Sequence, residues 1–263
     1  MVGPILLALY RLRIALRPVG RAVRGAIRWW WCSREVTNFT YELTAANERQ
    51  LAAFVAPIAS ASLARVRAYM DELASDDALR SHLREATLAL PGAAMADPEP
   101  RYGRRLGWYA LVRLLKPRIV VETGVDKGLG ACVLAAALAR NTVEGHPGEY
   151  IGIDLNPAAG SLFGGPYERF GRILYGDSLE RLREIKSIDF FVHDSDHSAE
   201  HEACEYELIE QQLSEGAVVL SDNAHVTDRL LEFSMRTKRR YLFFQERPYD
   251  HWYPGGGIGV AFP

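Results

Sequence analysis

Residues 188–201 read IDFFVHDSDHSAEH, and residues 216–225 read GAVVLSDNAH. Each stretch is an apolar run, rich in β-branched and aromatic residues, that ends abruptly in acidic and amide side chains. This pattern is typical of a buried parallel strand whose carboxyl end opens onto a site. In open α/β sheets, ligands bind beyond the carboxyl ends of such strands. The two stretches therefore predict an α/β fold with a site at the point where both runs end.

Oxygen-rich side chains stand at these two strand ends. Asp194 follows the first run, and Asp222 and Asn223 follow the second. If the two strands are neighbours, the three side chains converge as hard oxygen ligands suited to Mg²⁺. The alternative is that they only cap the helices that follow, as Asp, Ser and Asn commonly do. Two adjacent acidic strand ends favour the metal site.

The elements around the two runs predict a doubly wound sheet. Arg118–Glu122 is a buried strand that leads through a glycine-bearing turn into an alanine-rich helix, Leu129–Arg140, which is how a nucleotide-binding fold opens. Further strands are expected at Tyr150–Leu155 and Gly171–Tyr175, with a terminal hairpin of Arg240–Gln245 and Gly257–Phe262. The expected fold is a mostly parallel, seven-stranded Rossmann-like sheet with a reversed edge strand.

The first hundred residues differ in character and suggest three parts. Residues 1–34 hold seven of the 31 lysines and arginines and no acid, which leaves 24 basic against 33 acidic residues in the remainder. A basic amphipathic segment that ends in Trp29, Trp30 and Trp31 is typical of contact with a membrane surface. Packing of this arm on a partner subunit of a homo-oligomer is the alternative. Residues 35–100 predict a helical cap, and residues 101–263 form the main domain.

Bulk properties limit the class of protein. A net charge of −2 gives no general affinity for nucleic acid. Three cysteines without paired spacing suit a reducing cytoplasm. The apolar stretch Pro4–Leu9 is too short to span a membrane, and its charges follow it instead of preceding it, unlike a secretion signal. A cytoplasmic protein with peripheral membrane contact through residues 1–31 is expected.

The turn after the first strand distinguishes between nucleotide cofactors. A Rossmann dehydrogenase needs G-x-G-x-x-G, whereas Gly124, Gly128 and Gly130 stand at other spacings and Asp126 replaces the second glycine. Without that glycine the backbone cannot closely approach a pyrophosphate, so a cofactor without a diphosphate is favoured. S-adenosylmethionine (SAM) fits, and Asp154 at the end of the next strand is placed to accept hydrogen bonds from its ribose.

From Arg118 to Phe262 the chain resembles the class I SAM-dependent methyltransferases, and among them the metal-dependent O-methyltransferases. The Glu-Thr-Gly turn matches their first motif without its usual central glycine, and the DSDHS and SDN stretches match their metal motifs. The nearest subgroup is the bacterial one that methylates sugar hydroxyls on macrolides and glycolipids, together with cephalosporin-hydroxylase-like proteins. The cofactor-binding residues that the resemblance implies are Glu122, Thr123, Gly124, Gly128, Asp154, Asp177 and Ser178.

The resemblance also implies a chemistry. The family's metal ligands correspond to Asp194, Asp222 and Asn223, and its general base corresponds to His197, where catechol-type relatives have lysine. Mg²⁺ bound to a sugar hydroxyl lowers the pKa of that hydroxyl, and a histidine that titrates near neutral pH can then take the proton. His225 is the substitute base.

Other interpretations remain open beside a Mg²⁺-dependent O-methyltransferase of a glycan, oligosaccharide or glycolipid. The acceptor could be a catechol or another polyphenol. His197–His201 spells H-x-x-E-H, a zinc-peptidase pattern. The domain could also be a catalytically silent SAM-fold module that docks a complex on a membrane, although the retained ligands and base argue against this. The aromatic loop Tyr249–Tyr253 is either a platform for a sugar or simple hairpin packing.

Overall fold

The structure, a computed structural model that describes residues 3–263, is built around one seven-stranded sheet with the order β3-β2-β1-β4-β5-β7-β6. The strands β1 to β5 are parallel, and β7 runs antiparallel to both β5 and β6. The strands are β1 (Ile119–Thr123), β2 (Glu149–Asp154), β3 (Gly171–Tyr175), β4 (Ile188–His193), β5 (Leu213–Ser221), β6 (Arg240–Gln245) and β7 (Gly257–Phe262). The predicted fold is confirmed, and the reversed strand of the hairpin lies one place in from the edge that β6 forms.

Helices cover both faces of the sheet because successive strand residues point to opposite sides. In β4, Phe190 and Val192 belong to one apolar cluster and Phe191 to the other. The first cluster lies under α5 (Arg105–Leu115) and α6 (Leu129–Val143), and the second lies under α8 (Ala199–Ile209) and α9 (Arg229–Arg236). The short helix α7 (Ser178–Leu182) follows β3, and the 3₁₀ turns are Ala93–Met95, Glu168–Phe170 and Glu210–Gln212.

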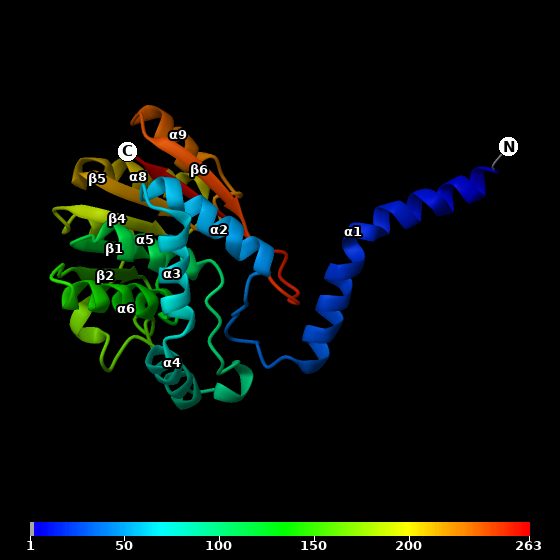
Figure 1. The fold of residues 1–263 in the computed structure, drawn as a ribbon, viewed down its shortest axis with the longest axis horizontal. Helices are drawn as coiled ribbons and strands as arrows, with labels where there is room; N and C mark the ends of the chain where they lie inside the picture. The colour runs from blue at the N-terminus through cyan, green and yellow to red at the C-terminus, as the bar shows by residue number, and fades with distance from the viewer. Residues whose placement is uncertain (1–2) are drawn as a thin grey trace.

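The cap consists of α2 (Ala45–Ile58), α3 (Leu63–Ala74) and α4 (Asp77–Ala89), which lie in front of α5 and α6 in Figure 1. Thr44, Ser62 and Asp76 cap the three helices by accepting hydrogen bonds from backbone amides. No single helix among the described residues is long and apolar enough to cross a membrane, although α2 and α3, bent by 120°, pass that test as a pair. The division of the chain at residues 34 and 100 remains a prediction.

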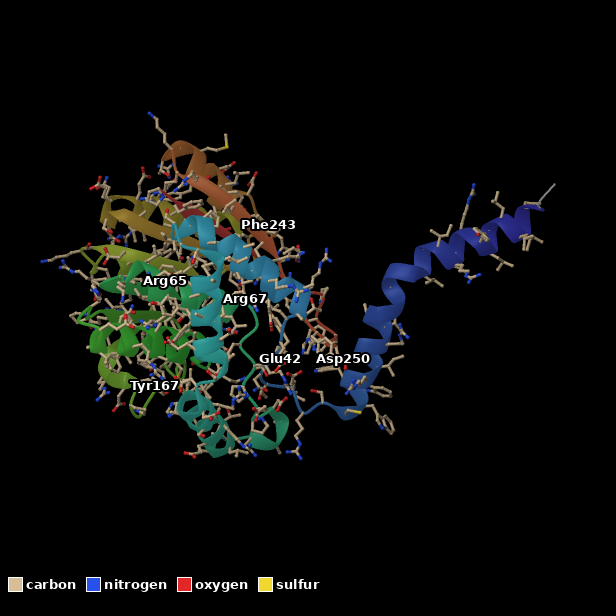
Figure 2. All side chains as sticks on the ribbon, in the orientation of Figure 1. Glu42, Arg65, Arg67, Tyr167, Phe243 and Asp250 are labelled. Atoms are coloured by element: carbon tan, nitrogen blue, oxygen red, sulfur yellow. The ribbon has the colours of Figure 1, made fainter. Side chains whose placement is uncertain are left out.

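The first helix, α1 (Pro4–Cys32), extends away from the rest of the molecule (Figure 1). Among the described residues of this helix, those of its C-terminal part contact the body. There Trp29 packs on Trp252 with the ring centroids 5.3 Å apart, and Arg28 forms an ion pair with Asp250. Figure 2 labels Asp250 on the loop between β6 and β7, beside this end of the helix. The arm is therefore a continuous helix fastened to the body at one end.

Candidate active site

A cavity of about 790 Å³ lies beyond the carboxyl ends of the central strands. The strands β4 and β5 are neighbours and are in register from Phe190↔Val218 to His193↔Ser221, so the residues that follow them, Asp194 and Asp222, stand side by side. The N-terminal part of the chain supplies the other wall through residues 38–40, 83, 87, 97, 98 and 100. This volume is typical of pockets for small molecules and cofactors.

Two carboxylates and an imidazole converge at the strand ends. Ligand atoms of Asp194, His197 and Asp222 all lie within 4.8 Å of one another. Asp222 is 2% exposed, and its Oδ1 has no hydrogen-bond partner among residues 3–263. Burial, and then the neighbouring charge of Asp222, raises the pKa of Asp194 well above its usual value. An unpaired buried oxygen beside a second carboxylate fits a bound cation, because such groups otherwise remain without compensation.

One cationic side chain already lies among these acids. The guanidinium of Arg104 bonds to Asp222 and lies 3.9 Å from Asp194 and 3.7 Å from Glu246. Its Nη1 also donates to the Tyr41 hydroxyl at 2.8 Å, and that hydroxyl donates to Glu246 at 2.5 Å. Three carboxylates therefore face one guanidinium, and the charge balance still favours a further cation.

Asn223, the third predicted ligand, lies at the edge of this group. Its backbone is left-handed, with φ of 53°, and its Nδ2 donates to Nε2 of His197 at 3.1 Å. Its Oδ1 is 3.5 Å from the hydroxyl of Tyr253. The structure thus brings all three predicted ligands and the predicted base to one place.

The two candidate bases have different surroundings. His197 packs edge-on against His193, and burial, followed by the charge of His193, lowers its pKa, so its imidazole is kept neutral. His225 is exposed, and its Nδ1 accepts a hydrogen bond from the backbone of Gly257 at 3.1 Å. His225 therefore fixes the hairpin. The zinc interpretation is not supported, because His201 turns toward Glu205 instead of joining the group around Asp194.

The predicted cofactor residues divide between cavity wall and support. Glu122, Gly124, Asp154, Asp177 and Ser178 line the cavity. A side chain at Gly124 would place its Cβ 2.0 Å from the Asp194 carbonyl oxygen, so this turn requires glycine. Asp154 also supports the turn, because its Oδ2 accepts hydrogen bonds from the backbone amides of Val125 and Asp126.

The other two residues of the predicted set serve the scaffold. Gly128 precedes the first residue of α6 and has a φ of 95°. A Cβ atom on it would lie only 3.1 Å from the Cα of Gly160. Thr123 is fully buried and donates its hydroxyl to Glu205.

The carboxylate of Glu205 ties the loops of the site together, and sequence reasoning missed it. It accepts hydrogen bonds at 2.5 to 3.1 Å from Thr123, Ser178, His193, Ser195 and His201. Burial alone would raise the pKa of Glu205, but the bonds from His193 and His201 hold it far below its usual range. The ends of β1 and β4 and the starts of α7 and α8 therefore share one buried anion. The sequence signal was its spacing of four from His201 on one helix face.

Replacement of Glu205 by glutamine is expected to lower the free energy of unfolding by about 3 kcal/mol, because several buried donors lose their acceptor. Since the pKa of Glu205 is lowered in the folded protein, its ionised carboxylate contributes fully to the free energy of unfolding at pH values above 4.5, the usual glutamate pKa. This contribution is lost as the pH falls further. Urea unfolding at neutral and successively lower pH should show the difference from wild type shrinking. Glu207→Gln, on the exposed side of the same helix, is the control and should change little. An equal effect of the two variants would contradict this role.

The aromatic loop Tyr249–Tyr253 packs against the N-terminal part of the chain. Trp252 contacts Phe39 with ring centroids 5.4 Å apart, in addition to Trp29, and Tyr253 packs on Tyr41 at 5.4 Å. Of the two interpretations offered by the sequence, packing is the one that the contacts favour.

Residues 121–224 match the family model described as a methyltransferase domain. This match agrees with the methyltransferase domain that the sequence predicts for this part of the chain. The family prediction is confirmed by that match and by the sheet order. A search of curated proteins finds no match to the sequence.

Several solved structures are similar to this chain. The Podospora anserina methyltransferase PaMTH1, solved with S-adenosylhomocysteine (SAH), has a TM-score of 0.50 at 17% identity, covering 76% of this chain and 94% of that one. The O-methyltransferase TomG from Streptomyces achromogenes, involved in tomaymycin synthesis and solved with SAM, has a TM-score of 0.49 at 18% identity, covering 71% and 87%. A methyltransferase from Geobacter sulfurreducens has a TM-score of 0.49 at 18% identity, covering 76% of this chain and 95% of that one.

Proposed function

We propose that this domain is a Mg²⁺-dependent O-methyltransferase that transfers the methyl group of SAM to a hydroxyl of a sugar in a glycan or glycolipid, in the cytoplasm. The observation that carries the proposal is the convergence of Asp194, His197 and Asp222 within 4.8 Å beside a cofactor-sized cavity. The unpaired Oδ1 of Asp222 supports a cation at this point, and TomG, with the same fold, is described as an O-methyltransferase.

Each residue of the group has a distinct task. Asp194, Asp222 and Asn223 would hold Mg²⁺, which, when bound, lowers the pKa of the acceptor hydroxyl. Arg104 fixes one oxygen of Asp222 and so leaves the other free for the cation. His197, held neutral by burial, takes the acceptor proton on Nε2 as that nitrogen exchanges its bond to Asn223. SAM, when bound, would supply the methyl group: the acceptor oxygen would bond to the methyl carbon as the carbon–sulfur bond breaks, with SAH as the leaving group.

The cavity wall agrees with a sugar acceptor. Phe39 lines the cavity and is 50% exposed, and an aromatic ring can stack on a sugar face. Because a sugar hydroxyl is a weaker acid than a catechol hydroxyl, its methylation depends more on a cation and a base, both of which this site offers. A catechol could stack on the same ring, so acceptor assays must include both classes.

The deciding experiment incubates the protein with methyl-labelled SAM and a panel of glycans, glycolipids and catechols. Label is expected in the sugar fraction, lost with EDTA and restored by Mg²⁺. Full activity in EDTA, restoration by zinc alone, or SAM binding without label in any acceptor would each reject the proposal. Label found only in catechols would instead indicate an O-methyltransferase that acts on polyphenols.

The cofactor's amino-acid end has two candidate partners in the cavity. Burial raises the pKa of Glu122 to about 7, although a hydrogen bond from Tyr150 and the charges of Arg105 and Arg104 act to lower it, and its carboxylate forms no direct ion pair with a described residue. Arg105, which sequence reasoning missed, lines the same cavity, and its buried Nε has no hydrogen-bond partner among the described residues. We place the ammonium of SAM at Glu122 and its carboxylate at Arg105.

This placement predicts a ligand-specific loss of affinity. Arg105→Gln should weaken SAH binding by about tenfold to a hundredfold, because a charge-assisted hydrogen bond contributes roughly 1.5–3 kcal/mol. It should leave 5′-methylthioadenosine, which lacks the amino-acid group, unaffected. Asp154→Asn, at the predicted ribose site, should weaken both ligands. Calorimetry with the two ligands and two variants checks this, and an equal loss of both ligands in Arg105→Gln would refute the placement.

A further inference from the structure

A continuous apolar stripe runs along α1, and no described segment covers it. Its side chains recur every three or four residues, so they share one face of the helix. Each is 45% to 77% exposed, and they are Ile5, Leu9, Leu12, Leu16, Val19, Val23, Ile27 and Trp30. In Figure 2 the side chains of the outer part of α1 stand clear of the body. A monomeric protein rarely leaves such a stripe in water, so this face has an occupant.

The charges beside the stripe identify the occupant's chemistry. Arg13 and Arg24 are 11 residues apart, about three turns, so the two share a second face. No acid occurs in residues 1–34. A second copy of the helix would bring like charges together along its whole length. An anionic lipid surface instead provides both an apolar layer for the stripe and phosphates for the arginines.

We propose that α1 lies flat in the surface of an anionic bilayer and that the bilayer presents the acceptor to the cavity. The acceptor would then be a lipid-linked sugar, an inference that rests on the proposed function. The 29-residue helix is about 44 Å long, and its arginines favour a position in the interface over a span. Trp30 and Trp31, 73% and 78% exposed, lie where the helix meets the body and suit the headgroup layer.

A buried carboxylate connects this helix to the cavity wall. Glu35 is 3% exposed and accepts hydrogen bonds from Trp29 at 3.1 Å and from the backbone of Thr40 at 3.2 Å. Its Oε2 is also 2.9 Å from Nε2 of His251 in the aromatic loop. Thr40 lines the cavity, and Tyr253 of the same loop contacts Asn223. The bilayer-bound helix therefore holds the cavity mouth close to the lipid headgroups.

Binding is tested with full-length protein and vesicles of phosphatidylcholine with and without phosphatidylglycerol. The double variant Leu9→Glu, Leu16→Glu places two charges in the stripe. Its matched control, Leu7→Glu with Ile14→Glu, carries the same charge change on a face about 160–180° away. The stripe variant should lower partitioning onto anionic vesicles by about a hundredfold or more, because two buried leucines are lost. The control should lose about tenfold or less through charge alone.

Lack of wild-type binding to anionic vesicles at low salt, or equal losses in the two variants, would overturn the docking proposal. A concentration-dependent dimer in sedimentation, dissolved by the stripe variant without any vesicle binding, would assign the stripe to a second copy instead.

Turnover separates docking from function. The acceptor is a glycolipid that the labelling screen identifies, offered in vesicles, against its water-soluble glycan. The stripe variant should keep turnover with the soluble glycan and lose at least about tenfold with the vesicle-borne one. Equal turnover by wild type and variant on vesicles would overturn the presentation role. Vesicle binding without methylation of any acceptor would support the docking proposal and reject the proposed function. Methylation of a soluble acceptor without vesicle binding would support the proposed function and reject the docking proposal.

Discussion

Asp222→Asn is expected to reduce Mg²⁺-dependent methyl transfer by about 10³-fold. A bound divalent cation contributes several kcal/mol to the stabilisation of the transition state, and each 1.4 kcal/mol corresponds to about a tenfold change in rate. The amide keeps the shape of the carboxylate and an oxygen for Arg104 but removes the charge that attracts the cation. Turnover measured against Mg²⁺ concentration, with SAH affinity as the control, checks the expectation. A variant that retains more than about a tenth of wild-type turnover would contradict the metal site.

Alanine is the wrong substitution at this position. The structure shows Asp222 only 2% exposed and bonded to the buried guanidinium of Arg104. Removing the side chain would leave Arg104 with less compensation in the interior, which is strongly destabilising. A loss of activity in Asp222→Ala would therefore mix unfolding with chemistry.

His197→Ala is expected to lower turnover by about 10²–10⁴-fold while changing the affinity for SAH and Mg²⁺ little. The neutral imidazole lies beside the acids that would hold the cation, with Nε2 3.7 Å from Asp194, so it can reach a hydroxyl bound there. Added imidazole should restore part of the activity, since it supplies the missing base. Single-turnover rates and Mg²⁺ titrations of the variant provide the measurement.

The same measurements distinguish the base from other roles. His225→Ala is the matched control, because it removes a similar ring that is exposed and bonded to the hairpin backbone. A parallel loss of Mg²⁺ affinity in His197→Ala would make His197 a metal ligand instead of the base, which the 4.8 Å grouping also allows. A larger loss in His225→Ala would assign the base to the other strand.

The sheet could be predicted because its signals are local. The limits of β3, β6 and β7 agree with those expected from the sequence, since apolar, β-branched runs bounded by turns define strands within a few residues. The proximity of Asp194 and Asp222 could also be predicted from the sequence, because neighbouring parallel strands end at the same edge of the sheet. The position of β7 did not follow: a hairpin pattern does not reveal which of its strands joins β5.

The polar support of the site could not be predicted, because its partners are distant in the chain. Tyr41 and Glu246 are separated by 205 positions, and Arg104 and Asp222 by 118. Arginine and glutamate are usually exposed, so nothing local marks these as buried. Glu205 does have a local partner in His201, four residues away, but like Glu35 it gains its role only when three or more segments fold around it.

The cavity is lined both by the helical cap and by the sheet, so a bound ligand couples these two layers of the molecule. Leu83 and Thr87 of α4 face the same space as Glu122 and Asp154 of the sheet. A ligand that touches both sides loses its contacts with Leu83 and Thr87 whenever the helical layer opens. At about one hundred times its dissociation constant, a ligand that does not bind the open form opposes opening by about 2.7 kcal/mol. Amide hydrogen exchange in α4 therefore reports cofactor occupancy, although α4 contributes no residue to the strands that form the site.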